Sequence, residues 1–334
     1  MDVTSPILEV KNLTVEYSAE TNSVLAVDRV SLQLGRHEFL GLVGESGCGK
    51  STLCFALAQL LSPPADVIDG EVVFNGRNLI HMRDTALRHI RWRELSVVMQ
   101  SAMNALNPVL NIGAQMTDAM QAHERISKKM ARARGGELLR MVGIDPIHLD
   151  SFPHQLSGGM RQRAMVAMAL VFTPELIIMD EPTSALDVVA QRSLMAQIKA
   201  LQREFGFAVI FVTHDMSLVG RFSDRLAIMY AGQIVEQAAT RDLFRDPKHP
   251  YSRGLLQAFP SIYGPKQKLQ GIPGRPPDLR FPPGGCRFHP RCPAVMDICR
   301  KEEPGEYAPG GDDLVRCFLY AREEVEHSKL HTVR

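Results

Sequence analysis

One segment, GESGCGKS from Gly44 to Ser51, constrains the fold of this chain more than any other. It follows the apolar stretch FLGLV and precedes a helix-like run that begins at Lys50. A strand, a glycine-rich turn and a helix in this order are typical of a phosphate-binding P-loop. The glycines let backbone N–H groups converge on a polyphosphate, the helix start adds its positive dipole end, and Lys50 adds a full charge. We expect nucleotide phosphates to bind at Gly44, Glu45, Ser46, Gly47, Cys48, Gly49, Lys50, Ser51 and Thr52.

The composition favours a soluble globular protein and excludes several function classes. Among 334 residues, 38 Lys plus Arg nearly balance 37 Asp plus Glu, so the overall basic field needed for non-specific nucleic-acid binding is missing. The longest apolar run that we find, residues 164–172, falls short of the roughly 18 residues of a membrane span. The N-terminus lacks the basic start and apolar core of a secretory signal. We therefore expect a cytosolic protein whose six cysteines stay reduced.

Hydrophobic patterns predict an α/β fold. Short alternating runs in residues 7–34, with EVVF at 71–74, predict an antiparallel β subdomain. The apolar runs LIIM (176–179), AVIFV (208–212) and LAIMY (226–230) alternate with helical segments, which indicates a mainly parallel sheet covered by helices on both sides. The prediction is a P-loop NTPase core with its β subdomain in residues 1–100 and 173–240, a helical lobe in residues 101–172, and a Pro/Gly-rich appendage in residues 241–334.

Two further segments carry candidate chemistry. LIIMDEP ends an apolar strand in two acids, of which Asp180 can hold Mg²⁺ and Glu181 can orient or deprotonate a water. The alternative is a pair of acids that caps the next helix. In LSGGM, Ser157 and the two glycines after it open a helix and offer a hydroxyl and free N–H groups to an anion. The alternative there is an ordinary helix N-cap followed by a glycine turn.

Taken together and in this order, the segments over about residues 7–240 resemble the ATP-binding cassette (ABC) family of transporter ATPases. GESGCGKS is similar to the Walker A motif, LSGGM to the family signature, LIIMDE to Walker B, SALD (184–187) to the D-loop, and VTHD to the switch histidine, His214. Gln100 lies where the family has its Q-loop glutamine, and Tyr17 fits the aromatic residue that stacks on adenine. The signature departs from the family pattern at Met160, where glutamine is more usual, and the serine and glycines that contact phosphate are kept.

The resemblance implies a role for each of these residues. Lys50 would hold the β- and γ-phosphates, Glu181 would activate the attacking water, and His214 would stabilise the γ-phosphate. Mg²⁺ would be held by Ser51, Gln100 and Asp180. In the family two cassettes pair head to tail, so the residues that would complete the partner's ATP site are Ser157, Gly158, Gly159 and Asp187. The alternatives are ordinary packing for Tyr17, a satisfied strand-end histidine for His214 and a polar strand end for Gln100.

The appendage narrows the resemblance over about residues 245–320. KHPYSRGLL, GIPGRPP and GCRFHPRCPAVMDIC resemble the C-terminal region of ATPase subunits from oligopeptide and dipeptide importers. Four thiolates can carry an iron-sulfur cluster or close a tetrahedral zinc site, and some members of the resembled group carry a 4Fe-4S cluster on such cysteines. We favour the cluster, with Zn²⁺ or unligated structural thiols as alternatives, at Cys286, Cys292, Cys299 and Cys317.

The hypothesis from the sequence is an ATP-hydrolysing, energy-coupling subunit of a peptide importer. It would bind ATP and Mg²⁺ at the cytoplasmic face of the cell membrane, paired with a second and probably different ABC ATPase chain. Its direct partners would be two separate membrane permease subunits, and an extracytoplasmic substrate-binding protein would be an indirect partner. We expect it not to bind nucleic acid. The alternatives are the same role for nickel or another small solute, a soluble ABC ATPase in translation or repair, and a regulator without catalysis.

Overall fold

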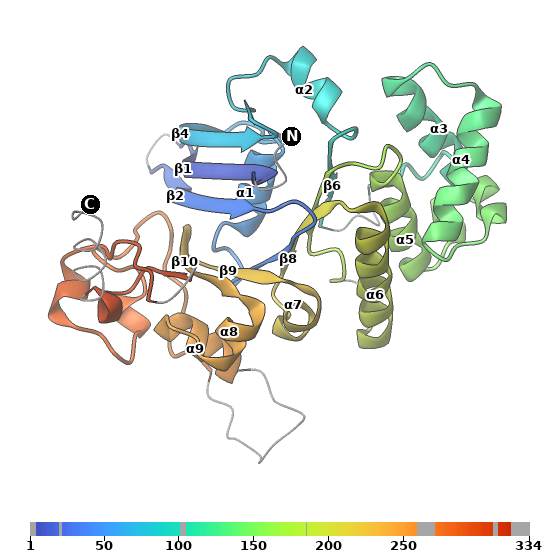
Figure 1. Ribbon diagram of the computed structural model, residues 1–334. Helices are drawn as coiled ribbons and strands as arrows, with labels where there is room; N and C mark the ends of the chain where they lie inside the picture. The colour runs from blue at the N-terminus through green and yellow to red at the C-terminus, as the bar shows by residue number, and fades with distance from the viewer. Residues whose placement is uncertain are drawn as a thin grey trace, which may run out of the picture.

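The computed structural model describes residues 5–19, 22–100, 105–184, 186–258, 271–309 and 313–321. Two sheets organise these residues (Figure 1). The smaller is antiparallel with strand order β2-β1-β4-β5, and its strands are β1 (Leu8–Tyr17), β2 (Val24–Leu34), β4 (Ala65–Phe74) and β5 (Arg77–Asn78). This sheet is the predicted antiparallel β subdomain, and EVVF forms the end of β4.

The larger sheet has the order β11-β10-β9-β3-β8-β7-β6 and is parallel from β9 to β6. Its strands are β3 (Phe39–Val43), β6 (Leu95–Val98), β7 (Leu176–Asp180), β8 (Ala208–Thr213), β9 (Arg225–Tyr230), β10 (Gln233–Ala239) and β11 (Leu314–Val315). Every residue of β3, β7 and β8 is buried. These strands read as continuous apolar runs because both faces of the sheet are covered.

The helix α1 (Lys50–Leu57) packs between the two sheets. Its Leu53 and Leu57 lie in one hydrophobic cluster with side chains from β1, β2 and β4 and with Leu40, Ile178 and Ile210 of the larger sheet. The alternate residues of the same strands face a second cluster on the other side of the sheet. The P-loop helix is thus fixed from both sides, which fixes the loop before it.

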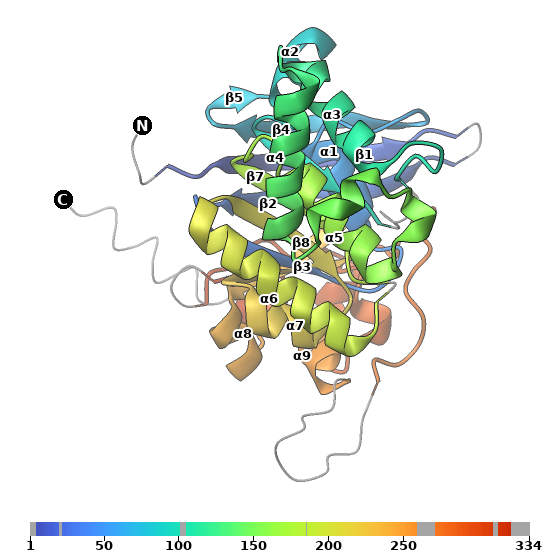
Figure 2. The same cartoon turned by 90° about the vertical axis from the view of Figure 1, so that its right-hand side faces the viewer.

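The second face of the larger sheet is covered by helices and by the helical lobe. Figure 2 shows α4, α5 and α6 on the side turned toward the viewer. The helices are α2 (Asp84–Ile90), α3 (Ile112–His123), α4 (Lys128–Met141), α5 (Gly158–Ala169), α6 (Val188–Phe205), α7 (Met216–Phe222), α8 (Thr240–Arg245) and α9 (Pro250–Gln257). Leu194, Ile198 and Leu201 of α6 are buried as the sequence predicts, whereas Phe205 in the last turn is exposed. In the part of the chain that is described, every helix is too short or too polar to cross a bilayer.

The appendage, coloured orange to red in Figure 1, begins with α8 and α9, and its described residues from 271 onward lie beside β10 and α9. These later residues form short 3₁₀ turns, as expected from their Pro and Gly content. Its strand β11 extends the larger sheet by pairing with β10, where Glu236 lies opposite Val315. The appendage is therefore attached to the ATPase core by backbone pairing as well as by side chains.

Candidate nucleotide site

Residues 44–49 form a tight turn between β3 and α1. Gly49 has φ 106°, and a Cβ there would lie 2.1 Å from the carbonyl oxygen of Ala26. A Cβ at Gly44 would lie equally close to the carbonyl oxygen of Met229. Only glycine fits at these two positions, since both contacts are with backbone that cannot move aside. The first turn of α1 holds no acidic residue and has no side-chain cap, so its N–H groups are open to an anion.

Lys50 directly follows this turn as the first residue of α1 and is 6% exposed. Its Nζ donates hydrogen bonds to the carbonyl oxygens of Gly44 (2.8 Å) and Glu45 (2.9 Å). A compact ammonium group with three donors can exchange such carbonyl partners for phosphate oxygens. The structure therefore leaves Lys50 with two partners that a bound polyphosphate could replace.

Asp180, at the end of β7, is 1% exposed, and neither of its carboxylate oxygens accepts a hydrogen bond from a described residue. Burial raises the pKa of this carboxyl, and the nearby Ser51 hydroxyl partly offsets that rise. A buried carboxylate without a partner is costly unless a cation or a donor satisfies it. Oxygen ligands from an Asp and a Ser suit Mg²⁺, so these two residues fit the predicted metal.

Glu181 is held by side chains from two neighbouring strand ends. Gln100 Nε2 donates to its Oε2 (3.0 Å), and His214 Nδ1 lies 3.3 Å from its Oε1. The three residues meet because β6, β7 and β8 are adjacent parallel strands whose carboxyl ends share one edge of the sheet. Glu181 also has φ 45°, a left-handed conformation that is unusual for a non-glycine residue and that often marks functional positions. The sequence did not reveal this strain.

Tyr17 ends β1 beside the P-loop helix. Its hydroxyl lies 3.2 Å from the Thr52 hydroxyl, which fixes the ring next to the nucleotide residues. Thr52 itself is 9% exposed. Whether the ring stacks on a base remains a prediction, and its position agrees with that role.

The signature and the D-loop lie side by side in the helical region. Ser157 caps α5 by accepting a hydrogen bond from Met160 N (3.3 Å), and Asp187 caps α6 by accepting one from Ala190 N (2.8 Å). Both caps line or adjoin a hollow of 210 Å³ between α5 and α6. Among the described residues, no hydrogen bond joins Ser157, Gly158 or Gly159 to the P-loop. Ser157 is thus the N-cap that the alternative interpretation gives, and Ser157, Gly158 and Gly159 remain candidates for contact with another chain.

The four cysteines of the appendage gather in one region but do not form a metal site. In the described part of the chain, no three His, Cys, Asp or Glu side chains are arranged to hold a metal ion, so the predicted 4Fe-4S or zinc ligand set is not supported. The thiols are nevertheless neighbours. Burial raises the pKa of Cys286 and of Cys317 to about 11, and the other thiols nearby add to both rises. Protonated thiols have no charge that would draw them into a tetrahedral arrangement.

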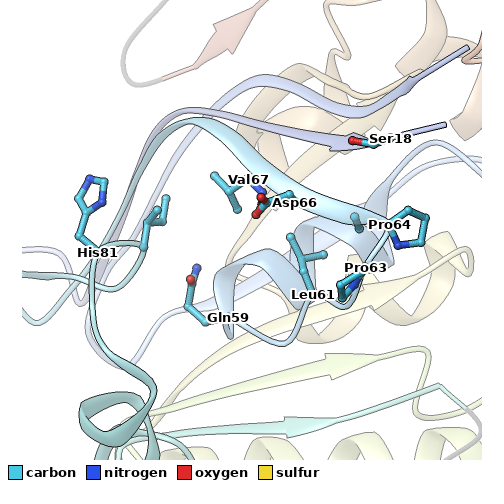
Figure 3. A pocket seen from close by; sticks show the side chains of 10 residues that line it. Ser18, Gln59, Leu61, Pro63, Pro64, Asp66, Val67 and His81 are labelled. Carbon is cyan, nitrogen blue, oxygen red and sulfur yellow. Dashed lines mark hydrogen bonds between the residues drawn. The ribbon is translucent and has the colours of Figure 1, made fainter. Parts of the chain in front are cut away.

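Size alone does not locate the nucleotide site. A hollow of 710 Å³ lies beside the carboxyl end of α1, and its lining includes Ser18, Gln59, Asp66 and His81 (Figure 3). None of the P-loop residues lines it. A second hollow, of 370 Å³, is apolar and lies between β6 and α5, next to the segment that carries Gln100. The phosphate site is identified by its chemistry, whereas the apolar hollow resembles a docking surface.

Sequence reasoning missed two residues that touch the P-loop from far along the chain. Tyr251 accepts a hydrogen bond from Glu45 N (2.9 Å), and Arg291 forms an ion pair with the Glu45 carboxylate. Both lie in segments that resemble the C-terminal region of peptide-importer ATPases, KHPYSRGLL and GCRFHPRC. No local pattern indicated what either side chain contacts.

Comparison with known proteins agrees with this geometry. A family model described as ABC transporter matches residues 27–184, and one described as oligopeptide/dipeptide transporter, C-terminal region, matches residues 235–299. The chain is 40% identical over 318 residues to the dipeptide transport ATP-binding protein DppD of Caldanaerobacter subterraneus, which covers 95% of this chain and 98% of the relative. It is 41% identical over 320 residues to the oligopeptide transport ATP-binding protein OppD of Escherichia coli, which covers 95% and 94%. A solved dimer of the ATP-binding cassette MJ0796, in a post-hydrolysis state bound to ADP and Pi, superposes with a TM-score of 0.64 at 29% identity over 70% of this chain and 99% of that one.

Proposed function

This chain belongs to the ABC transporter ATPases with an oligopeptide/dipeptide transporter C-terminal region, and we propose that it powers import of dipeptides or oligopeptides by hydrolysing ATP. The observation that carries the proposal is the meeting of Lys50, Asp180 and Glu181 with Gln100 and His214 at one sheet edge. Phosphoryl transfer requires positioning and charge stabilisation, which such a preorganised set supplies.

The proposed roles follow from the contacts. Lys50 exchanges two carbonyl partners for phosphate oxygens, while Ser51, Gln100 and the unpartnered Asp180 provide oxygen ligands for Mg²⁺. When bound, Mg²⁺ neutralises charge on the β- and γ-phosphate oxygens. Glu181 orients the attacking water and takes its proton, and His214 stabilises the γ-phosphate. Tyr17 stacks on the adenine.

Ser157, Gly158, Gly159 and Asp187 are proposed to complete the ATP site of a second cassette. Ser157 and Asp187 cap two adjacent helices beside one hollow. Val188 and Val189, which follow Asp187, are 62% and 78% exposed. Two neighbouring exposed valines are well suited to a contact surface between chains. We further propose domain boundaries at residues 100, 172 and 240, as predicted from the sequence.

The apolar hollow between β6 and α5 is proposed to receive a segment of a membrane permease subunit. It is lined by Leu60, Trp92, Val97, Met99, Met165 and Met168 among others, and Met99 directly precedes Gln100. Thioether side chains adapt to a bound apolar partner. A permease segment seated there would sense movement of Gln100 and of the helical lobe. The ATPase would then act at the cytoplasmic face of the membrane as a peripheral subunit.

The experiment is purification of the chain with the permease subunits encoded beside it, followed by ATPase assays with and without peptide and binding protein. We expect permeases to co-purify and peptide to stimulate phosphate release. The variant Lys50→Ala should abolish ATP turnover, while the permease subunits should still co-purify with it. Co-purification with ribosomes or DNA, or turnover that is indifferent to Lys50, would contradict the proposal.

We also propose that the four cysteines rearrange to take up a 4Fe-4S cluster, because they are neighbours even though the described side chains are not arranged to hold a metal ion. The backbone N–H groups of Phe288, Ala294 and Leu319 act against the burial that raises the pKa of the Cys286, Cys292 and Cys317 thiols, and they favour the thiolate forms. Such N–H groups stabilise thiolates that bind a metal centre. An anaerobic preparation should contain iron and sulfide and show thiolate-to-iron absorption, all of which Cys292→Ser should reduce. A preparation that contains zinc, or no metal at all, would rule the cluster out.

A further inference from the structure

The P-loop residue Glu45 is held by two side chains from the C-terminal part of the chain. Arg291 Nη1 donates to Glu45 Oε2 (2.6 Å), and Arg291 Nη2 donates to Glu45 Oε1 (2.9 Å). The Tyr251 hydroxyl accepts a hydrogen bond from the Glu45 backbone N–H (2.9 Å). The backbone and the side chain of one P-loop residue are thus fixed separately, by two residues more than 200 positions away.

The clamp of Arg291 and Tyr251 on Glu45 is itself rigidly supported. The Arg291 side chain is 5% exposed, and its Nε donates to the carbonyl oxygen of Pro273 (2.8 Å). Tyr251 is fully buried, and its ring packs on that of Tyr230 with 4.6 Å between centroids. A two-pronged guanidinium–carboxylate pair gains geometric precision as well as energy. Because these residues are packed, the clamp determines where Glu45 lies.

The position of Glu45 matters for nucleotide binding in two ways. Its carboxylate lies in a loop that receives polyphosphate, where an unpaired negative charge would repel the ligand. Its carbonyl oxygen also accepts a hydrogen bond from Lys50 Nζ (2.9 Å), so the orientation of this peptide influences where the lysine lies. An ion pair that removes the charge and a hydrogen bond that fixes the backbone would together prepare the loop for phosphate.

We propose that Arg291 is a positioning residue for ATP binding, which neutralises Glu45 and, together with Tyr251, holds the P-loop in its phosphate-binding shape. Arg291 directly precedes Cys292, so the clamp extends from the four-cysteine region to the nucleotide site. The ATPase activity of the family is the premise, and the clamp is a property of this chain beyond it.

The test measures binding of a fluorescent ATP analogue to the full-length chain in its transporter assembly, together with KM and kcat for ATP. Arg291→Ala should weaken nucleotide binding and raise KM at least about tenfold, with a much smaller change in kcat at saturating ATP. Arg291→Lys keeps the charge but loses the two-pronged geometry, so its affinity should fall between those of the wild type and Arg291→Ala. Arg280→Ala is the matched control, because Arg280 belongs to the same appendage and, among the described residues, pairs only with the exposed Asp278.

If Arg291 acts by neutralising Glu45, removing the Glu45 carboxylate should partly restore binding, which a purely structural role of Arg291 does not predict. In the double variant Glu45→Gln/Arg291→Ala the repelling carboxylate is gone, so nucleotide should bind more tightly than to Arg291→Ala alone. Binding of Arg291→Ala that equals that of Arg280→Ala, or a double variant that binds no better than Arg291→Ala, would overturn the proposal. If Arg291→Ala fails to fold, the same comparison is made between Arg291→Gln, which also removes the charge, and Glu45→Gln/Arg291→Gln.

Discussion

At the scale of single residues, Glu181 combines three features of a reacting group. It is mostly buried, it has a left-handed backbone conformation, and its carboxylate is held by Gln100 and His214. Backbone strain of this kind costs about 1–3 kcal/mol and persists only where the surroundings enforce it. This strained geometry favours a functional role for Glu181 over the alternative in which the two acids only cap the next helix.

The variant Glu181→Gln should therefore lose turnover while it keeps ATP binding. Glutamine has the same shape and can still pair with Gln100 and His214, so the geometry is preserved and only the charge and the proton acceptor are removed. We expect phosphate release to fall at least about 10²-fold.

Phosphate release and nucleotide affinity should be measured in parallel for this variant. Glu137→Gln, an equivalent change at an exposed position of α4, serves as the control. Near-normal turnover in Glu181→Gln would move the proton acceptor elsewhere. A matching loss of ATP binding would mean that the carboxylate acts in binding rather than in the chemical step.

At the scale of elements, the strands of the larger sheet were predictable because burial on both faces leaves an unbroken apolar run. FLGLV and AVIFV are found as β3 and β8 almost residue for residue. The meeting of the residues that end these strands was also predictable, because adjacent parallel strands bring their carboxyl ends to the same edge of the sheet. Glu181 and His214 meet on that account.

Contacts that depend on how distant elements pack were not predictable. Arg291 and Glu45 are 246 positions apart, and neither belongs to a periodic pattern that would indicate its partner. The left-handed conformation of Glu181 is set by the packing around the strand end, which composition does not encode. The cysteine spacing predicted a gathering of thiols but not their arrangement, because protonated thiols do not order one another.

The helix α9 makes the stability of the chain dependent on pH through His249. This residue caps α9 by accepting a hydrogen bond from Tyr251 N on Nδ1 (3.0 Å), and it is 1% exposed. Burial, with a smaller contribution from Arg253, lowers its pKa from 6.5 to about 3. The unfolded chain therefore binds a proton that the folded chain excludes, so this contribution to stability falls as the pH drops from about 6.5 toward 3.

Removing the titrating group should flatten that dependence. Asparagine retains a side-chain acceptor for the cap, so His249→Asn should lower stability near neutral pH. As the pH falls through this window, the variant should lose up to about 1.4 kcal/mol less stability per pH unit than the wild type. Urea unfolding at several pH values measures the slope. Equal slopes for the variant and the wild type would show that His249 is protonated in the folded chain. His289→Asn, at a partly exposed histidine in the appendage, is the control.

At the scale of the whole molecule, the signature residues and the P-loop belong to different parts of the chain. Figure 1 shows α5 beside α6, on the side of the sheet where the helical lobe lies. The proposed pairing would bring a second cassette's signature to this P-loop. On that proposal turnover depends on assembly, whereas nucleotide binding to the P-loop depends on it less.

The variant Gly159→Asp separates these two properties. A Cβ at Gly159 would meet nothing nearer than Leu186 Cδ2 at 3.9 Å, so the chain has room for a side chain there. An acidic residue in the first turn of α5 is also compatible with the helix dipole. Folding and nucleotide binding by the isolated chain should therefore be unchanged. In the assembled transporter, the new carboxylate would face a partner's phosphates and repel them.

We expect turnover of the assembly to fall at least about tenfold in Gly159→Asp, which corresponds to about 1.4 kcal/mol. Ala133→Asp, at an exposed position of α4, adds the same charge to the same lobe and should leave turnover intact. For the wild type and both variants, we would measure thermal unfolding and binding of an ATP analogue on the isolated chain. Phosphate release would be measured on the assembled transporter. Unchanged turnover would place Gly159 outside the partner's site, and weakened binding by the isolated chain would mean that α5 serves its own P-loop.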